Sequence, residues 1–189
     1  MQHAIVTFLG ESDYLSGEAL SEIRHEYVDG HVYAMAGASK AHNIIAGNIF
    51  AHLRQQLRGS PCRAFVADMK VKVEPSRAYY YPDVVVTGAE QDTAPDAPRD
   101  ILTAPILIVE VLSESTDNID RREKMCAYGL IDSLQEYLLV DSREARAELF
   151  RRRPEGGWEQ WIVTPGDTLR LASVGLDLAV ADLYEDADL

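Results

Sequence analysis

Two short apolar segments, each with one carboxylate inside it, constrain the fold of this chain more than any other feature. The first is YYYPDVVV at residues 79–86, which contains Asp83, and the second is PILIVEVL at residues 105–112, which contains Glu110. Apolar, β-branched runs of this length are typical of strands that are covered on both faces. An ionised carboxylate in such a strand is costly unless it is paired, protonated or bound to a cation. We therefore expect two buried strands whose acids have a function.

The residues before the first apolar segment predict a helix and a hairpin. Segment 11–26 has the composition of a short helix that is interrupted by Gly17. Asp29 and Gly30 supply the positive φ angles of a tight turn, after which a strand is expected at 31–36.

A second helix and a long strand are expected next. Apolar residues recur every four positions over residues 40–58, which predicts an amphipathic helix with Ser39 as its N-cap. Apolar and polar residues alternate over 62–74, which predicts one long strand with a single buried face. Residues 88–104 are acidic and Pro-rich without periodicity, so a loop is expected there.

After the second apolar segment, a helix is expected from Thr116 or Asp117 to about Tyr128, where Gly129 ends it. The later segments with patterns of strands, and one of a short helix, are 133–140, 145–151, 158–164, 168–171 and 180–185. The expected fold is α/β, with a mixed central sheet flanked by helices, an N-terminal helix-hairpin and a small C-terminal β extension. No repeat or linker divides the chain, so a single domain over residues 1–189 is expected.

The net charge of −13 argues against a protein that coats or carries nucleic acid, because the chain repels phosphates at long range. The charge is unevenly spread. Residues 78–120 contain nine acids and only Arg99 as a base, whereas residues 54–77 have a net charge of +4. A basic surface in the second segment can still meet a phosphate backbone, and a bound divalent cation offsets part of an acidic field.

The sequence has no apolar run long enough to span a membrane, and MQHAIVTFLG lacks the basic region and apolar core of a signal peptide. Cys62 and Cys126 are too few for a disulfide framework or a zinc site, and both are expected to be core or half-buried thiols. These features favour a cytoplasmic location.

Four motifs together give a resemblance to a known family. They are HEYVDGHVYAMAGAS, YPDVVV, PILIVEVLSEST and DRREKMCAYGLIDSLQEYLLVD, which occur in this order over residues 22–141. A chain with these motifs resembles the restriction-endonuclease-like PD-(D/E)xK superfamily and, within it, the Uma-two family. The resemblance implies a restriction-endonuclease-like sheet and hydrolysis of phosphodiester bonds in nucleic acid, and DNA is favoured over RNA as the substrate.

The resemblance also implies a metal site. Asp83 and Glu110 are expected to lie side by side at the end of the sheet, where their carboxylates and the backbone carbonyl of Val111 offer oxygen ligands for Mg²⁺ or Mn²⁺. Such an ion lowers the pKa of a bound water and stabilises charge on the phosphate. The simpler explanation for the two acids is a buried pair that is kept for structure or a site that has lost activity.

The simplest motif of the superfamily has a lysine two residues after the Glu, where this chain has Leu112. Lys124, on the following helix, is the expected substitute, with Asp120 as its i, i+4 partner. A lysine at that place orients the attacking water or neutralises charge on the phosphate. The alternative is a lysine on a solvated helix surface within a charged DRREK run.

Other polar residues near the motifs are weaker candidates for the active site. His42, in the first turn of the helix at 40–58, is a secondary candidate for the site. Asp68 is either directed toward the site or on a solvated strand face, and the solvated position is favoured. Glu26 and Asp29 are interpreted as turn and solvated edge residues.

Two other classes of function stay open. The chain is either an inactive relative that serves as a binding or dimerisation module, with Trp158 and Trp161 as contact surface, or a metal-dependent hydrolase of another substrate. Ordinary strand packing is the favoured interpretation of the two tryptophans. A homodimer is expected for an enzyme that cuts two strands.

Overall fold

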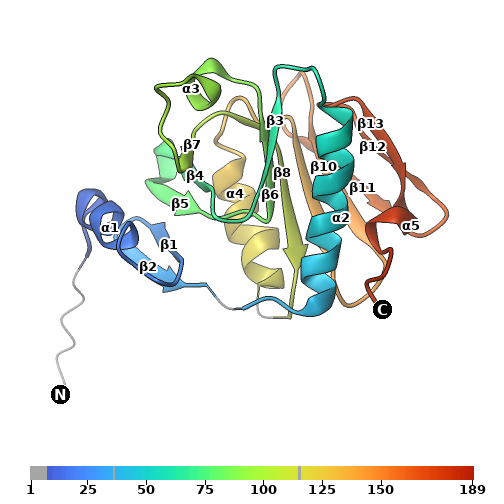
Figure 1. Ribbon diagram of the computed structural model, residues 1–189, viewed down its shortest axis with the longest axis horizontal. Helices are drawn as coiled ribbons and strands as arrows, with labels where there is room; N and C mark the ends of the chain where they lie inside the picture. Colours follow the sequence, from blue (N-terminus) through green and yellow to red (C-terminus); the bar gives the residue numbers. More distant parts are fainter. Residues whose placement is uncertain (1–7, 36, 115) are drawn as a thin grey trace.

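The structure is a computed structural model that describes residues 8–35, 37–114 and 116–189. Within these residues, a six-stranded mixed sheet has the order β11-β10-β9-β8-β6-β3, in which only β8 and β9 are parallel neighbours (Figure 1). Its strands are Arg63–Val66 (β3), Val84–Thr87 (β6), Pro105–Leu112 (β8), Glu136–Asp141 (β9), Ala147–Arg152 (β10) and Trp158–Val163 (β11). The predicted α/β fold with a mixed central sheet flanked by helices is confirmed.

Each face of the central sheet is covered by a different layer, and this explains why the two apolar segments are continuous runs. Val84 and Val86 face a core that the sheet shares with helix α2 (Lys40–Gln56), whereas Val85 faces a second core. β8 alternates in the same way, because successive side chains of a strand point to opposite faces. Glu110 therefore takes a position on the face of the second core that an apolar residue would otherwise fill.

The second core lies between the central sheet and a five-stranded sheet that the sequence did not predict. This sheet has the order β2-β1-β5-β4-β7. Its strands are His25–Val28 (β1), His31–Ala34 (β2), Lys70–Val73 (β4), Ala78–Tyr80 (β5) and Ile101–Leu102 (β7). Because residues of both sheets pack in this core, we propose that the chain folds as one domain.

The single long strand expected over 62–74 is wrong. Ala67 and Asp68 adopt positive φ angles of 48° and 53°, and the Met69 N–H donates to the Ala67 carbonyl at 2.7 Å. This turn sends β3 into the central sheet and β4 into the five-stranded sheet. The expected loop at 88–104 also contains more structure than predicted, since β7 and the short helix α3 (Glu90–Thr93) lie within it.

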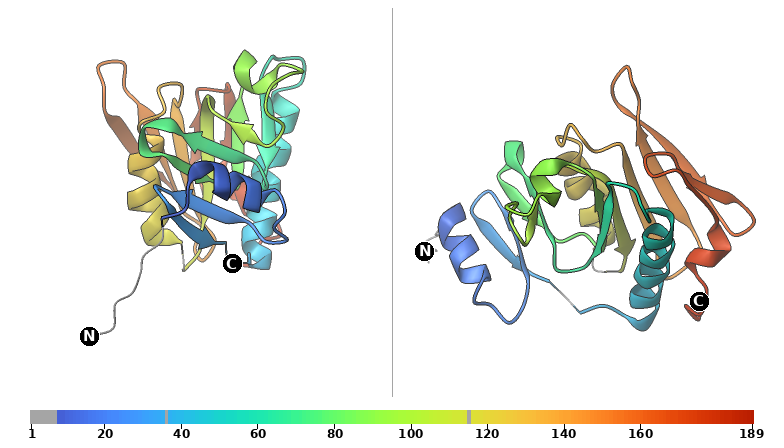
Figure 2. Two further views of the ribbon diagram at one scale, coloured as in Figure 1. Left: turned by 90° about the vertical axis from the view of Figure 1, so that its left-hand side faces the viewer. Right: turned by 45° about the horizontal axis from the view of Figure 1, so that its top comes forward.

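Residues 8–35, here called the N-terminal arm, contain helix α1 (Glu11–Glu18) and the hairpin β1–β2. The helix ends earlier than position 26 because His25–Val28 pairs with β2 and β5. Of the strand expected at 31–36, Ala36 lies outside the described residues. The arm lies on the side of the molecule away from α2 and the C-terminal strands (Figures 1 and 2).

Helix α2 begins as predicted, since the Ser39 Oγ accepts a hydrogen bond from the His42 N–H at 3.1 Å. The helix after β8 also lies where it is expected, and Gly129 follows its last residue. Its central part, Ile119–Lys124 (η2), is a π-helix that continues into Met125–Tyr128 (α4). Ser115, in the turn before it, lies outside the described residues. A single turn of 3-10 helix, Glu74–Ser76 (η1), precedes β5.

The C-terminal β extension is only partly separate from the central sheet. β10 and β11 continue the sheet beyond β9, whereas Thr168–Leu171 (β12) and Leu176–Ala179 (β13) form a two-stranded sheet that packs on the first core. The helix expected at 180–185 is observed as Val180–Leu183 (α5).

Cys62 and Cys126 are both free, and Cys126 is exposed rather than half-buried. Among residues 8–35, 37–114 and 116–189, no helix has the length and apolarity that crossing a membrane requires.

Candidate active site

Asp83 lies directly before β6, and the antiparallel pairing of Val84 with Val109 brings it beside Glu110 and Val111. The Val111 N–H donates to the Asp83 Oδ2 at 2.7 Å, and the His42 Nε2 lies 2.8 Å from the Asp83 Oδ1. Both oxygens are thus oriented by groups from other elements. The carboxylate keeps about a fifth of its surface exposed, with 21% side-chain accessibility.

Glu110 is more deeply buried than Asp83, with only 4% of its side chain exposed. Its Oε1 accepts hydrogen bonds from the Tyr128 hydroxyl at 2.9 Å and from the Lys124 Nζ at 3.2 Å. Burial raises the pKa of Glu110 well above its ordinary value; Lys124 opposes this shift, and the nearby carboxylates of Asp120, Asp83 and Glu26 add to it.

Lys124 is enclosed by three carboxylates. Its Nζ lies 2.9 Å from the Glu26 Oε1, 3.2 Å from the Glu110 Oε1 and 3.2 Å from the Asp120 Oδ1, and 6% of its side chain is exposed. The predicted i, i+4 pair with Asp120 is present, and the solvated-surface alternative is wrong. The Nζ also lies 5.7 Å from the centre of the Tyr80 ring.

The protonation of Lys124 and that of Glu110 are coupled by this arrangement. Burial alone would lower the pKa of Lys124, but attraction to Glu110, Glu26 and Asp120 outweighs burial and raises it. One ammonium divided among three carboxylates cannot compensate each of them fully. The lysine therefore stays charged, and the pKa of the buried Glu110 carboxyl stays above its ordinary value.

The π-helical turn η2 directs both Lys124 and Asp120 into this cluster. Both side chains are almost fully buried, although they lie in the charged run IDRREK. A π-helical turn is rare within helices and often occurs at functional sites. The Tyr137 hydroxyl donates to the Asp120 carbonyl at 3.1 Å, which ties this turn to β9.

His42 joins the site from the first turn of α2. Burial alone would lower its pKa, but the hydrogen bond to Asp83 and attraction to Asp83 and Asp120 raise it. Its Nδ1 is buried and has no hydrogen-bond partner within the described residues. A buried polar atom without a partner is unusual for a structure that is fully optimised for stability.

Asp68 is not part of this cluster. Its side chain is 71% exposed in the turn between β3 and β4, where it pairs with Arg24 at 3.1 Å. The favoured prediction of a solvated Asp68 thus agrees with the structure, although the residue lies in a turn and not in a strand.

Glu26 is a site residue that the sequence analysis missed. It was interpreted as a solvated edge residue, but its side chain is 14% exposed and forms an ion pair with Lys124. Asp29 does lie at the surface, where it pairs with Arg77 at 3.0 Å. The only signal for Glu26 was its place in a strand beside the buried Tyr27, and that signal does not specify which face the acid takes.

The cluster offers few acidic ligands to a divalent cation, but its chemistry fits Mg²⁺. No three His, Cys, Asp or Glu side chains are arranged as a metal site within the described parts of the chain. Mg²⁺, however, is usually bound by only one or two carboxylates and keeps several waters. The Asp83 and Glu110 carboxylates meet that requirement, and the excess of carboxylates over cationic groups leaves the cluster negative.

Part of the basic surface expected over 54–77 is neutralised by ion pairs with acids. Lys70 pairs with Asp100 at 2.5 Å, and Lys72 pairs with both Glu11 and Glu74. This segment therefore offers less positive charge to a phosphate backbone than its composition indicates.

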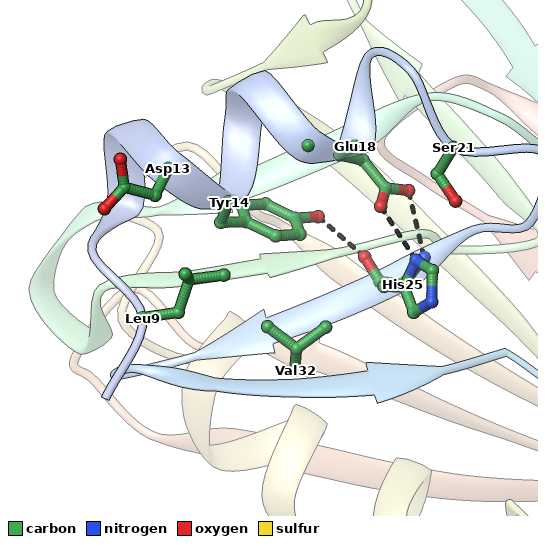
Figure 3. Close-up of a pocket in the computed structure, with 8 residues that line it drawn as sticks. Leu9, Asp13, Tyr14, Glu18, Ser21, His25 and Val32 are labelled. Atoms are coloured by element: carbon green, nitrogen blue, oxygen red, sulfur yellow. Dashed lines mark hydrogen bonds and ion pairs between the residues drawn. The ribbon is translucent and has the colours of Figure 1, made fainter. Parts of the chain in front are cut away.

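A separate pocket of about 210 Å³ lies in the N-terminal arm, lined by Leu9, Asp13, Tyr14, Gly17, Glu18, Ser21, His25 and Val32 (Figure 3). It shares no residue with the cluster around Lys124. The Glu18 carboxylate in this pocket accepts from the His25 N–H at 2.9 Å and lies 3.0 Å from the His25 Nδ1. Burial raises the pKa of Glu18, but the hydrogen bonds from His25 and Tyr81 outweigh burial and lower it overall. Glu18 thus has partners that a structural role explains.

Comparison with proteins of known sequence or structure agrees with the motifs. Two proteins of Synechocystis sp. (strain ATCC 27184 / PCC 6803 / Kazusa), both described as uncharacterized, are similar to this chain. The protein slr1290 is 35% identical over 93% of this chain and 91% of its own length. The protein sll1609 is 34% identical over 85% of this chain and 89% of its own length.

The fold also matches a solved structure. A crystal structure from Anabaena variabilis ATCC 29413, described as a putative nuclease belonging to DUF820, superposes with a TM-score of 0.78 at 18% identity, over 96% of this chain and 98% of that one. The expected fold class is confirmed by this likeness. The model of the Uma2 family, described as "Putative restriction endonuclease", matches residues 12–181. The resemblance that the sequence motifs indicated is therefore confirmed, and this chain belongs to the Uma2 family.

Proposed function

We propose that this protein is a metal-dependent endonuclease that hydrolyses phosphodiester bonds in nucleic acid. The observation that carries the proposal is the meeting of Asp83 and Glu110 at the paired strands β6 and β8, with the Lys124 ammonium bound to Glu110. The family description and the nuclease name of the structural neighbour support the same reaction. The preference for DNA over RNA rests on the restriction endonucleases to which the family is compared.

Mg²⁺ or Mn²⁺ would be held by the Asp83 and Glu110 carboxylates and the Val111 backbone carbonyl. When bound, a divalent ion supplies Lewis acidity and a water of lowered pKa. The ion also reduces the negative charge of the cluster, which otherwise repels a phosphate backbone. The raised pKa of Glu110 is consistent with a carboxylate that lacks sufficient positive charge nearby.

The side chains of the cluster hold these ligands in place. The Tyr128 hydroxyl fixes one Glu110 oxygen, and the Val111 N–H and His42 fix the two oxygens of Asp83. The Lys124 ammonium, which stays charged, is placed to neutralise charge that develops on the phosphate. Because these groups come from five separate elements or connections, the site exists only in the folded chain.

A nuclease assay tests this proposal directly. Supercoiled plasmid, single-stranded DNA and RNA are incubated with the protein in Mg²⁺, Mn²⁺ or a chelator. We expect cleavage of DNA in the presence of either metal, and loss of cleavage in the chelator and in Asp83→Asn. Equal cleavage by wild type and Asp83→Asn would show that a contaminating nuclease is responsible, and hydrolysis of a small phosphodiester without cleavage of nucleic acid would indicate another substrate.

We also propose that the protein is a homodimer whose subunits meet through the N-terminal arm. Of the twelve exposed large hydrophobic residues in the described chain, seven lie in the arm: Phe8, Leu9, Leu20, Ile23, Val32, Tyr33 and Met35. β2 is the edge of its sheet and all four of its residues are exposed. Such a strand is a template for pairing with another chain.

The composition of β2 suits pairing with a second copy. The strand contains no acid, so two chains of net charge −13 can meet there without opposing carboxylates. Light scattering on wild type and on Tyr33→Lys tests this surface. A dimer that becomes monomeric in the variant is expected, and a monomeric wild type would contradict the proposal.

An inactive binding or dimerisation module is the second candidate, and the enclosure of Lys124 favours it. An ammonium with 6% of its side chain exposed is poorly accessible to a substrate. The rings of the half-buried Trp158 and Trp161 stack on Arg152 and Arg151 and pack against the two cores, as expected for strand packing. An inactive module predicts identical Mn²⁺ titrations for wild type and Asp83→Ala.

A further inference from the structure

Glu26 connects the N-terminal arm to two elements of the candidate active site. Its Oε1 lies 2.9 Å from the Lys124 Nζ, which is the shortest of the three carboxylate contacts of that ammonium. The same oxygen accepts a hydrogen bond from the Tyr81 N–H at 3.3 Å, two residues before Asp83. One carboxylate thus contacts both the helix that bears Lys124 and the segment that leads into Asp83.

The strand pattern of β1 directs Glu26 toward the site. Tyr27 is fully buried against Tyr14 and Tyr79, and its backbone pairs with Tyr79 in β5. Because successive side chains of a strand alternate, Glu26 and Val28 point to the opposite face, where Val28 packs against the second core. The tyrosine cluster therefore anchors the strand that holds Glu26 in place.

The three carboxylates around Lys124 differ in what else they do. Glu110 is one of the two acids that would bind the metal, and Asp120 is the neighbour of Lys124 on its own helix. Glu26 comes from a different sheet, and its closer contact holds the ammonium away from full pairing with Glu110. Without Glu26, Lys124 would be shared by Glu110 and Asp120 alone and would occupy more of the Glu110 carboxylate.

We propose that Glu26 is a positioning residue that holds the Lys124 ammonium beside, but not fully paired with, Glu110, and so makes the site depend on docking of the N-terminal arm. This inference rests on the proposed nuclease function for its catalytic consequence. The contact itself is independent of that function.

A double-mutant cycle between Glu26 and Lys124 tests this role. The variants are Glu26→Gln, Lys124→Met and their combination, assayed on supercoiled plasmid DNA with Mn²⁺. Loss of an outer partner of a metal site typically costs 10–100-fold, so we expect Glu26→Gln to lower kcat by about that factor with KM little changed. Residues that act as a unit are not additive, so the double variant should match Lys124→Met within about twofold.

Asp29→Asn is the matched control, because Asp29 lies three residues away in the same hairpin and pairs only at the surface with Arg77 in the contacts described. It should leave kcat unchanged. Glu26→Asp, which keeps the charge, should recover part of the loss. Lys124→Arg replaces Lys124→Met in the cycle if the latter does not fold.

The same cycle measured by urea unfolding separates this inference from the proposed function. The shift of the unfolding midpoint in the double variant should be smaller than the sum of the two single shifts. If wild type cleaves no DNA but the midpoints are non-additive, the nuclease proposal fails and the Glu26–Lys124 contact stands. Additive effects on both kcat and the midpoint would overturn the positioning role.

Discussion

Two buried glutamates on adjacent strands have opposite surroundings. Glu136 on β9 is fully buried, and its oxygens accept from the Arg151 Nε at 2.8 Å, the Ala172 N–H at 3.1 Å and the Ser173 N–H at 2.9 Å. Glu110 on β8 has one hydroxyl and a share of one ammonium, among three other carboxylates. Both acids lie on strands of the central sheet, in which β8 and β9 are parallel neighbours.

The difference separates an acid with structural partners from the acid of the candidate active site. Hydrogen-bond donors surround Glu136, so its charge is compensated within the fold. Burial raises the pKa of Glu110; Lys124 opposes this shift, and the surrounding acids add to it. Burial among like charges, rather than burial alone, makes Glu110 a candidate site residue.

The largest difference between variants of the two glutamates is expected in the rate of DNA cleavage. Metal Lewis acidity is worth several kcal/mol and each 1.4 kcal/mol is a factor of ten, so Glu110→Gln should lower kcat/KM by about 10³-fold. Glu136→Gln should have the same kcat/KM as wild type when activity is expressed per folded molecule. The measurement is plasmid nicking at matched concentrations of folded protein, and comparable losses in the two variants would remove the distinction.

Stability should show the reverse order. Glu136→Gln places an amide group against N–H donors and weakens the bond to Arg151, which should lower the free energy of unfolding by about 2 kcal/mol. Glu110→Gln removes a poorly compensated charge and should leave that free energy unchanged or raise it. Urea denaturation in a chelator measures both, and a larger loss in Glu110→Gln would contradict the account.

The pH dependence of stability should sharpen the contrast. Because the pKa of Glu110 is raised on folding, the native state holds a proton that the unfolded chain releases near the ordinary value of 4.5. Stability from this group is complete below that value and is lost as the pH rises through the raised pKa. In metal-free buffer, the free energy of unfolding of Glu110→Gln should therefore rise relative to that of wild type as the pH rises above 4.5. A difference between the two proteins that does not change with pH would show that the pKa of Glu110 is not raised.

His42 should have a smaller effect, because it acts through Asp83. Removing an outer partner of a ligand costs about tenfold or somewhat more, so His42→Ala should lower kcat/KM by about that factor. Since the pKa of His42 is raised from 6.5, the stability it contributes is complete below pH 6.5 and is lost as the pH rises through the raised value. Asp68→Asn, at an exposed pair, should change neither activity nor stability, and an equal effect of the two variants would exclude a role for His42.

Several residues of the candidate site could be predicted from the sequence. Asp83 and Glu110 interrupt apolar strands, which marked them as candidates, whereas their meeting with Lys124 was predicted from the resemblance to the family. His42 was a candidate because of its place in the first turn of α2.

The parts that were missed depend on contacts between distant segments. The break of the strand at Ala67 and Asp68 has no glycine or proline to mark it, and both residues adopt positive φ angles because β3 and β4 pair in different sheets. The role of Glu26 likewise depends on the pairing of β1 with β5, which lies about fifty residues along the chain. Local patterns do not encode such pairings.

The central claim is that Asp83 and Glu110 hold a divalent cation, and calorimetric titration with Mn²⁺ tests it most directly. The account predicts that wild type and Glu136→Gln bind the ion with the same affinity, and that Glu110→Gln and Asp83→Asn lose binding while they remain folded. Equal heats of binding in all four proteins, or none in wild type, would contradict it.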